Sequence, residues 1–80
     1  MSYDKPIAEQ IVARYNWLKK ESNFNKKDDT GERTPQYHNL CHLEAELRMC
    51  ERILLRQVGK EKIVEMLDFV HEAFRRLEQG

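Results

Sequence analysis

The residues in this sequence best suited to chemistry are three histidines and a glutamate. His38 and His42 stand four positions apart in the segment YHNLCH, Glu46 follows four positions later, and His71 lies farther along the chain. Imidazoles at a spacing of four share one face of a helix, and such a pair can hold one transition metal ion. Metal binding is therefore the first chemical function that the pattern suggests, provided that the fold supplies further ligands.

The segment YHNLCH, residues 37–42, resembles the short Tyr-His-Asn segment, followed by a second histidine, that opens the helical domains of HD-type and cyclic-nucleotide phosphodiesterases. In those domains the first metal-binding histidine comes from this neighbourhood. The resemblance covers six residues of 80, and the chain has no His-Asp dipeptide and no room for the remaining metal-ligand helices. It therefore implies no phosphodiesterase activity here.

A second feature with chemical potential is a series of arginines. Arg48, Arg52 and Arg56 recur every four residues, with two lysines just beyond them. Such a strip can bind the phosphates of a nucleotide or nucleic acid, or an acidic partner protein. A solvated helix face is the alternative, because Glu44 lies four residues before Arg48. The 14 basic and 14 acidic side chains also balance, which disfavours tight nonspecific binding to nucleic acid.

Aromatic residues gather in the first half of the chain, at Tyr15, Trp17, Phe24 and Tyr37. They predict a groove that could stack a base or hold a peptide helix, although core filling explains Tyr15 equally well. Trp17 falls off the apolar stripe of its segment, so it is a candidate binding anchor. Together with the arginines, this groove is the basis of an alternative function, the binding of a small nucleotide or phosphate.

Several classes of function are disfavoured by what the sequence lacks. It contains no glycine-rich phosphate loop, no serine in a nucleophile turn and no recognisable pair of catalytic carboxylates, so we expect a protein that is not an enzyme. No apolar run is long enough for a membrane span or a signal peptide. Two cysteines nine positions apart on one predicted helix cannot bond to each other, which fits a reducing, cytoplasmic environment. A disulfide between two copies in a dimer is the alternative.

The elements that must position these residues are helices, and the sequence predicts an all-α fold. Apolar residues spaced four, four and three apart follow Pro6 and predict a first helix over about residues 6–22, with Asp4 as its cap. A polar loop over about residues 22–34 comes next, and Phe24 is its expected anchor. The 80 residues allow a single domain, 1–80.

A long helical hairpin is predicted for the rest of the chain. Thr34 followed by Pro35 is a strong helix start, and a heptad-like apolar pattern continues from there over about residues 35–58. Gly59 then acts as a C-cap, and a second heptad pattern covers about residues 60–78. Two matching patterns joined by a tight turn predict antiparallel packing of these helices.

This hairpin suggests how the candidate metal ligands could meet. If the chain reverses near Gly59, His71 lies opposite Leu47 and within about one turn of Glu46 and His42. His42, Glu46 and His71, with His38 nearby, would then supply nitrogen and carboxylate ligands to a transition metal. The alternative interpretation places the histidines half exposed at the edge of the core, with no cofactor bound.

The first functional hypothesis is a small non-enzymatic interaction protein, an adaptor or inhibitor that binds another macromolecule through a helix face. So short a chain has a marginal core, which favours a homodimer formed through the outer face of the second helix. Apolar anchors would be joined by arginines that select an acidic or phosphorylated partner. The predicted partner-binding residues are Trp17, Arg48, Met49, Arg52, Ile53 and Arg56. The metal-binding and nucleotide-binding functions remain the alternatives.

Overall fold

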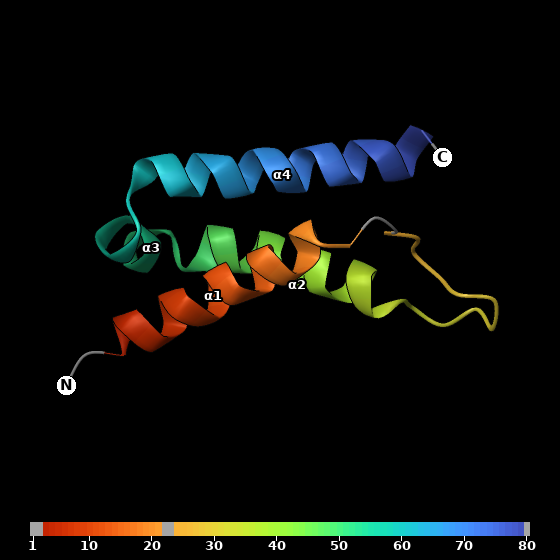
Figure 1. Cartoon of the computed structure of the whole chain (residues 1–80), viewed down its shortest axis with the longest axis horizontal. Helices are drawn as coiled ribbons and strands as arrows, with labels where there is room; N and C mark the ends of the chain where they lie inside the picture. The colour runs from red at the N-terminus through yellow and green to blue at the C-terminus, as the bar shows by residue number, and fades with distance from the viewer. Residues whose placement is uncertain (1–2, 22–23, 80) are drawn as a thin grey trace.

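The computed structural model describes residues 3–21 and 24–79 of the chain, and these are arranged as an elongated all-α fold. The molecule measures 45 × 22 × 20 Å, with its helices roughly along the long dimension (Figure 1). The predicted all-α class is confirmed. The helices are α1 (Asp4–Lys19), α2 (Pro35–Met49), α3 (Glu51–Gln57) and α4 (Lys60–Gln79).

Helix α1 begins and ends earlier than predicted. Asp4 is its first helical residue, and Tyr3 is the N-cap without a side-chain hydrogen bond, so the expected capping role of Asp4 is wrong. Pro6 is thereby the third helical residue, where a missing backbone N–H costs nothing because the first amides of a helix have no intrahelical partner. The helix ends at Lys19 rather than at residue 22, which lies outside the described residues.

The start of α2 follows the prediction. The Thr34 side chain accepts a hydrogen bond from the backbone N–H of Tyr37 at 3.1 Å, and Pro35 occupies the first helical position. Both features satisfy or remove backbone donors that a helix start leaves without partners. This cap fixes where the segment that carries the histidine pair becomes helical.

The predicted continuous helix over residues 35–58 is wrong, because the chain leaves helical geometry at Cys50. The φ and ψ angles of Cys50 are −111° and 23°, which separate α2 from the short α3. Hydrogen bonds from Cys50 N to Glu46 O and from Leu54 N to Cys50 O, at 2.8 and 2.9 Å, hold the two helices together across the bend. Helix α3 is turned out of the line of α2 and packs against α1 and α4 (Figure 1). Its sequence is apolar on more than one side, and the bend buries Leu54 while Leu55 stays exposed.

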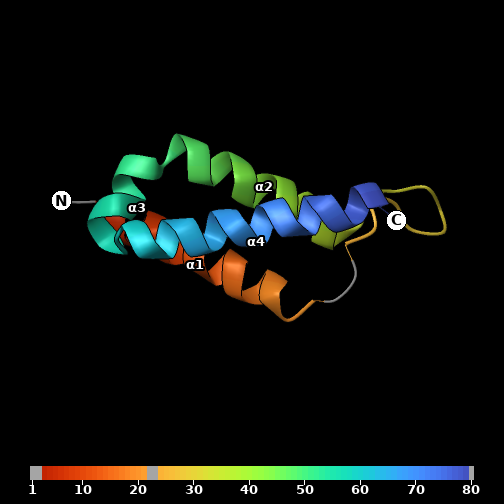
Figure 2. The ribbon, with the colours of Figure 1, turned by 90° about the horizontal axis from the view of Figure 1, so that it is seen from above.

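Gly59 ends α3 and permits the change of direction into α4. Its φ angle is 87°, in the region where glycine has no Cβ penalty, and its amide donates to the carbonyl of Leu54 at 3.3 Å. From Lys60 onward α4 lies alongside α2, as both views show (Figures 1 and 2). The fold is therefore a bundle of three long helices with α3 closing one end.

The core lies between α1, α2 and α4 and is apolar among the described residues. Its side chains come from one stripe on each helix, and no polar side chain of the described ranges is buried with them. The buried residues are Ala8, Ile11, Tyr15, Leu18, Phe24, Leu40, Leu43, Leu47, Leu54, Ile63, Met66, Val70 and Ala73. All the predicted stripes contribute to this cluster, which confirms the periodicity on which they rested.

The expected anchor of the polar loop, Phe24, is buried as predicted. Its ring packs edge-on against Phe69 of α4, with ring centres 6.0 Å apart. Edge-to-face contacts at this distance are favourable because the positive ring edge faces the negative ring face. The loop is thereby attached to the far side of the core from the α3 end.

The rest of the loop forms a compact turn around Asp28. One carboxylate oxygen accepts hydrogen bonds from the backbone N–H and hydroxyl of Thr30 and from the backbone N–H of Glu32, at 2.9, 2.6 and 3.0 Å. These bonds favour the ionised carboxylate and hold the pKa of Asp28 below its ordinary value. An isolated antiparallel bridge between Lys27 and Arg33 closes the turn. This part of the loop is therefore an ordered turn, whereas its composition predicted only a polar connection between two helices.

Candidate functional site

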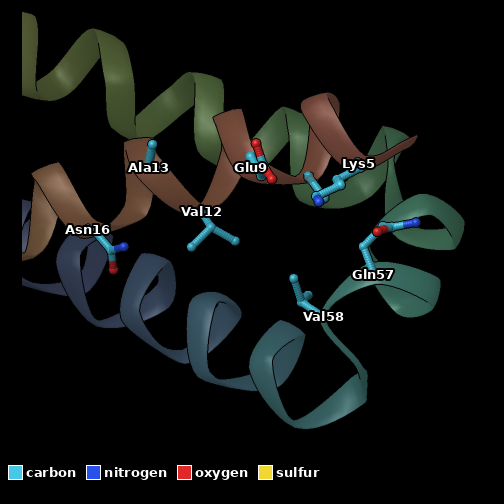
Figure 3. A pocket seen from close by; sticks show the side chains of 8 residues that line it. Lys5, Glu9, Val12, Ala13, Asn16, Gln57 and Val58 are labelled. Carbon is cyan, nitrogen blue, oxygen red and sulfur yellow. The ribbon is translucent and has the colours of Figure 1, made fainter. Parts of the chain in front are cut away.

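A mainly apolar hollow of the described surface lies between α1 and the turn from α3 into α4. It has a volume of about 340 Å³, and its floor is formed by small apolar side chains, among them Ala8, Val12 and Val58. Val12 and Val58 point toward one another across the gap between the two elements (Figure 3). We call this hollow the α1–α3 groove. Small side chains on its floor leave room for larger apolar groups of a ligand.

Two polar contacts join α1 to the neighbouring helices at opposite ends of the α1–α3 groove. Near its start, Asp4 forms an ion pair with Arg56 of α3 at 3.5 Å. Near its end, the Tyr15 hydroxyl donates to Glu65 of α4 at 2.6 Å, and the Tyr15 ring packs edge-on against Phe69 with ring centres 5.3 Å apart. The groove lies between these two attachments, above the surface where α1 packs against α3.

The attachment at Tyr15 is also an electrostatic cluster. The ammonium groups of Lys19 and Lys62 each lie 5.1 Å from the centre of the Tyr15 ring, and Lys62 also forms an ion pair with Glu65 at 3.0 Å. Burial, followed by the hydrogen bond to Glu65 and its negative charge, raises the pKa of Tyr15 to about 12. The hydrogen bond from Tyr15, and then that from Lys62, lowers the pKa of Glu65. The cluster thus fixes a neutral tyrosine against an ionised carboxylate.

This cluster predicts that the fold loses stability in strong base. The folded pKa of Tyr15, about 12, lies above the ordinary value of 10.0, so between these pH values the folded chain keeps a proton that the unfolded chain releases. The free energy of unfolding should therefore fall as pH rises from 10 to 12, by roughly 2 kcal/mol in total. Urea unfolding followed by circular dichroism at pH 8, 10, 11 and 12 measures this loss. Tyr15→Phe should reduce the pH-dependent loss, and an identical profile in both proteins would contradict the prediction.

Lysines lie near both ends of the α1–α3 groove. Lys5 and Glu9 stand on its rim, and a shallower hollow beside Asn16, Lys19 and Lys20 continues along the same helix. Within the described residues, neither Lys5 nor Lys20 has a carboxylate partner. The exposed side of α1 therefore presents apolar floor residues among uncompensated lysines.

The predicted apolar anchors fall in different environments. Met49 is 84% exposed at the bend between α2 and α3, and Arg52 is exposed just beyond it. Ile53 is partly buried and packs against the core, which leaves it less available as an anchor. Trp17 is 41% exposed on α1 and takes part in no ring contact among the described residues. Met49 is the most exposed large apolar side chain of the predicted set.

The arginine strip is divided by the bend at Cys50. Arg48 forms an ion pair with Glu44 at 3.8 Å within α2, and it lines a hollow of about 500 Å³ between α2 and α4. Arg56 reaches across to Asp4 of α1. Two of the three predicted arginines are thus paired with carboxylates on different sides of the molecule.

The four aromatic residues that were predicted to form one groove lie in different parts of the structure. Tyr15 and Phe24 both contact Phe69 in the core, whereas Tyr37 lies beside Arg33, with the guanidinium carbon 5.8 Å from the ring centre. The structure therefore uses two of the four predicted groove residues as packing and leaves Trp17 apart from them.

The structure does not bring the predicted metal ligands His42, Glu46 and His71 together. Glu46 faces α1, where it forms an ion pair with Arg14, and His71 lines the hollow that also contains Arg48. In the described ranges no group of three or more His, Cys, Asp or Glu side chains is placed to hold a metal ion. Glu46 and His71 face different neighbours of α2, and the register of a helical hairpin does not specify which side of a helix a residue occupies.

The histidine pair itself is formed as the spacing predicts. His38 and His42 are both exposed on α2, and their ring centres lie 5.3 Å apart. Helical spacing of four residues brings the two rings over successive turns of one face. Among the predicted ligands, these two are the ones that the structure places side by side.

Arg14 is the main interhelical contact that sequence reasoning missed. Its Nε donates to the Asn39 side-chain oxygen at 3.1 Å, and its Nη1 pairs with the Glu46 carboxylate, so one side chain joins α1 to two turns of α2. Arg14 lies three residues after Ile11 and four before Leu18, at the border of the apolar stripe. That spacing was the signal for a charged residue facing a neighbouring helix.

The comparisons with known proteins add no assignment to this geometry. No helix in the described part of the chain has both the length and the apolar character needed to cross a membrane. No protein-family model matches the sequence, and no curated protein or solved structure matches it either.

Proposed function

We propose that this chain is a small helical interaction protein that binds an amphipathic helix of another protein in the α1–α3 groove. The observation that carries the proposal is the apolar floor of this groove, at Ala8, Val12 and Val58, left open beside lysines without carboxylate partners. An apolar groove with a polar rim is the usual arrangement for helix-in-groove recognition. The proposal assigns the chain no catalytic step.

The length of the α1–α3 groove suits a helix as the ligand. Its α1 side extends from Lys5 to Asn16, and 11 residues at 1.5 Å each give about 16 Å, or three helical turns. A partner helix would place apolar residues at positions i, i+3 or i+4, and i+7 along such a groove. Burial of a few such anchors supplies most of the affinity of a typical interface.

The charge around the groove favours an acidic partner. Lys5 stands near one end and Lys19 and Lys20 near the other, against the single carboxylate of Glu9 on the rim. Carboxylates on the flanks of the partner helix would face these lysines, which speeds encounter and selects against basic helices. We therefore assign the selection of an acidic partner to lysines of α1, whereas the first hypothesis assigned it to the arginines of α2 and α3.

The experiment uses two synthetic 18-residue amphipathic peptides with the same leucine face. One carries glutamate and the other lysine on the flanking positions, and binding is followed by fluorescence anisotropy of a label on the peptide. We expect the acidic peptide to bind at least about tenfold more tightly, a difference of 1.4 kcal/mol. Equal affinity for the two peptides would contradict the proposed charge selection.

Two variants locate the binding surface. Ala13→Gln adds bulk to the lining of the groove, and Lys5→Glu with Lys20→Glu reverses charge at its two ends. Ala13→Gln should weaken binding of the acidic peptide by about tenfold or more, as expected for a contact in the middle of the groove. The double charge reversal should weaken it by a similar factor, because like charges would then face each other. Lys26→Glu with Lys27→Glu reverses the same number of charges in the exposed loop and serves as the matched control. Equal losses in the control and the groove variants would remove the groove from the proposal.

Self-association is a second proposed property, and the 84% exposure of Met49 is the observation that favours it. A flexible apolar side chain projecting at a helix bend can insert between two copies of a chain. Sedimentation velocity should then show a dimer that Met49→Glu converts to a folded monomer. Identical sedimentation of both proteins would end the assignment of Met49 to a dimer contact.

A further inference from the structure

The ring nitrogens of His38 and His42 have no hydrogen-bond or ion-pair partner in the described part of the structure. Both imidazoles are exposed, and within the described residues neither makes a hydrogen bond or an ion pair. Their interaction in the structure is the contact between the two rings, with planes inclined by 55°. The ring nitrogens are thus available to a ligand without breaking any interaction that holds the fold together.

The spacing of the two rings fits a shared metal ion. At a metal–nitrogen distance of about 2.0–2.1 Å, the centre of an imidazole ring lies about 3.2 Å from the ion. Two rings bound to one tetrahedral ion therefore have centres about 5 Å apart. The observed separation of 5.3 Å is close to this value, so binding requires little rearrangement of α2.

We propose that His38 and His42 form a two-nitrogen chelate for a divalent transition metal on the exposed face of α2. Imidazole suits Zn²⁺, Ni²⁺ and Cu²⁺, and the general order of affinity places Cu²⁺ above the other two. The pair differs from the constellation of His42, Glu46 and His71, because both ligands come from one helix. The remaining coordination positions are open to water. The site is independent of the α1–α3 groove, so either can fail without the other.

The placement of both ligands on one helix has an energetic consequence. An ion that binds the folded helix but not the unfolded chain stabilises the fold by mass action. The ion joins successive turns near the start of α2, where Thr34 and Pro35 already fix the helix. Metal binding should therefore raise the thermal midpoint as well as appear in a titration.

The experiment is calorimetric titration of the untagged protein at pH 7.5 with Ni²⁺, Zn²⁺ or Cu²⁺, with Mg²⁺ as a hard-ion control. We expect a stoichiometry of one ion per chain. His38→Ala and His42→Ala should each weaken binding by about tenfold or more, because each removes half of the chelate. His71→Ala deletes the third histidine, which lies beside Arg48 and Phe74, and should change the affinity less than twofold.

The free thiols require a separate control, since Cys41 lies beside the pair in sequence and thiolates bind the same ions. The titrations are therefore repeated in a Cys41→Ser background, in which the affinity should persist. The thermal midpoint should rise with Ni²⁺ in the wild type and remain unchanged by Ni²⁺ in a His38→Gln His42→Gln variant. Binding that survives loss of both histidines, that disappears with Cys41, or that needs His71 would overturn the proposal.

Discussion

Replacement of Leu54 by alanine should lower the free energy of unfolding by about 2–5 kcal/mol, the range found when a buried leucine is truncated. Leu54 is 0% exposed and is the buried side chain of α3. Its loss opens a cavity where α3 packs against α1 and α4. An 80-residue domain has a total stability of only about 5–10 kcal/mol, so the variant should lose a large fraction of it and unfold at a clearly lower temperature.

The neighbouring residue supplies a matched control for this prediction. Leu55 has the same side chain and is 51% exposed, so Leu55→Ala should change the stability by about 0.5 kcal/mol or less. Urea unfolding of both variants, followed by circular dichroism, gives the two differences. Similar losses at the two positions would mean that α3 is oriented differently on the core.

Replacement of Arg14 by methionine is the second large effect that we expect, with a loss of about 1–3 kcal/mol. The Arg14 and Glu46 side chains are 23% and 21% exposed, so their charges are partly removed from water. Methionine keeps most of the aliphatic packing of Arg14 but leaves the Glu46 carboxylate and the Asn39 oxygen without their donor. The cost should come mainly from these unpaired acceptors, because a half-buried carboxylate is expensive without a partner.

A double-mutant cycle separates this pairing from other effects of the substitution. Arg14→Met, Glu46→Gln and the double variant should show a coupling of at least about 1 kcal/mol between the two positions. The pair of Arg56 with Asp4 also joins α1 to another helix, α3, but Arg56 is largely exposed, so Arg56→Gln should cost much less. Additive losses at Arg14 and Glu46 would show that the ion pair contributes little to α1 docking.

Much of the fold follows from local signals in the sequence. The helix start at Thr34 and Pro35 was predictable because a hydroxyl acceptor followed by a residue without an N–H satisfies backbone chemistry locally. The burial of Phe24 was predictable because a lone aromatic residue in a polar loop gains free energy by packing. Such features depend on a few adjacent residues, and the sequence contains all of the information that decides them.

The bend at Cys50 was not predictable in the same way. No proline or glycine marks this position, and the apolar heptad spacing continues through it. The break depends on how α3 packs against α1 and α4, and those contacts come from residues distant in sequence. Local periodicity therefore predicts a helix on both sides of residue 50, but it does not predict the orientation of α3 relative to α2.

The two candidate sites differ in the same way, since one depends on local spacing and the other on the packing of distant helices. The spacing of His38 and His42 was sufficient to pair their rings, since both lie on one helix. The α1–α3 groove was signalled only indirectly, by Ala8 and Val12 widening the apolar stripe of α1. Whether such a wider stripe is covered depends on the angle between α1 and α4, which a single sequence does not specify.

The turn around Asp28 has a consequence for the order of folding. Helices α2, α3 and α4 follow one another closely in sequence, so their contacts close short loops, whereas α1 must dock across the intervening connection. The entropic cost of bringing chain ends together depends on the length of flexible chain between them. By closing that connection on itself between Lys27 and Arg33, the turn shortens its effective length. We therefore expect the turn to speed the late docking of α1, the step that creates the groove.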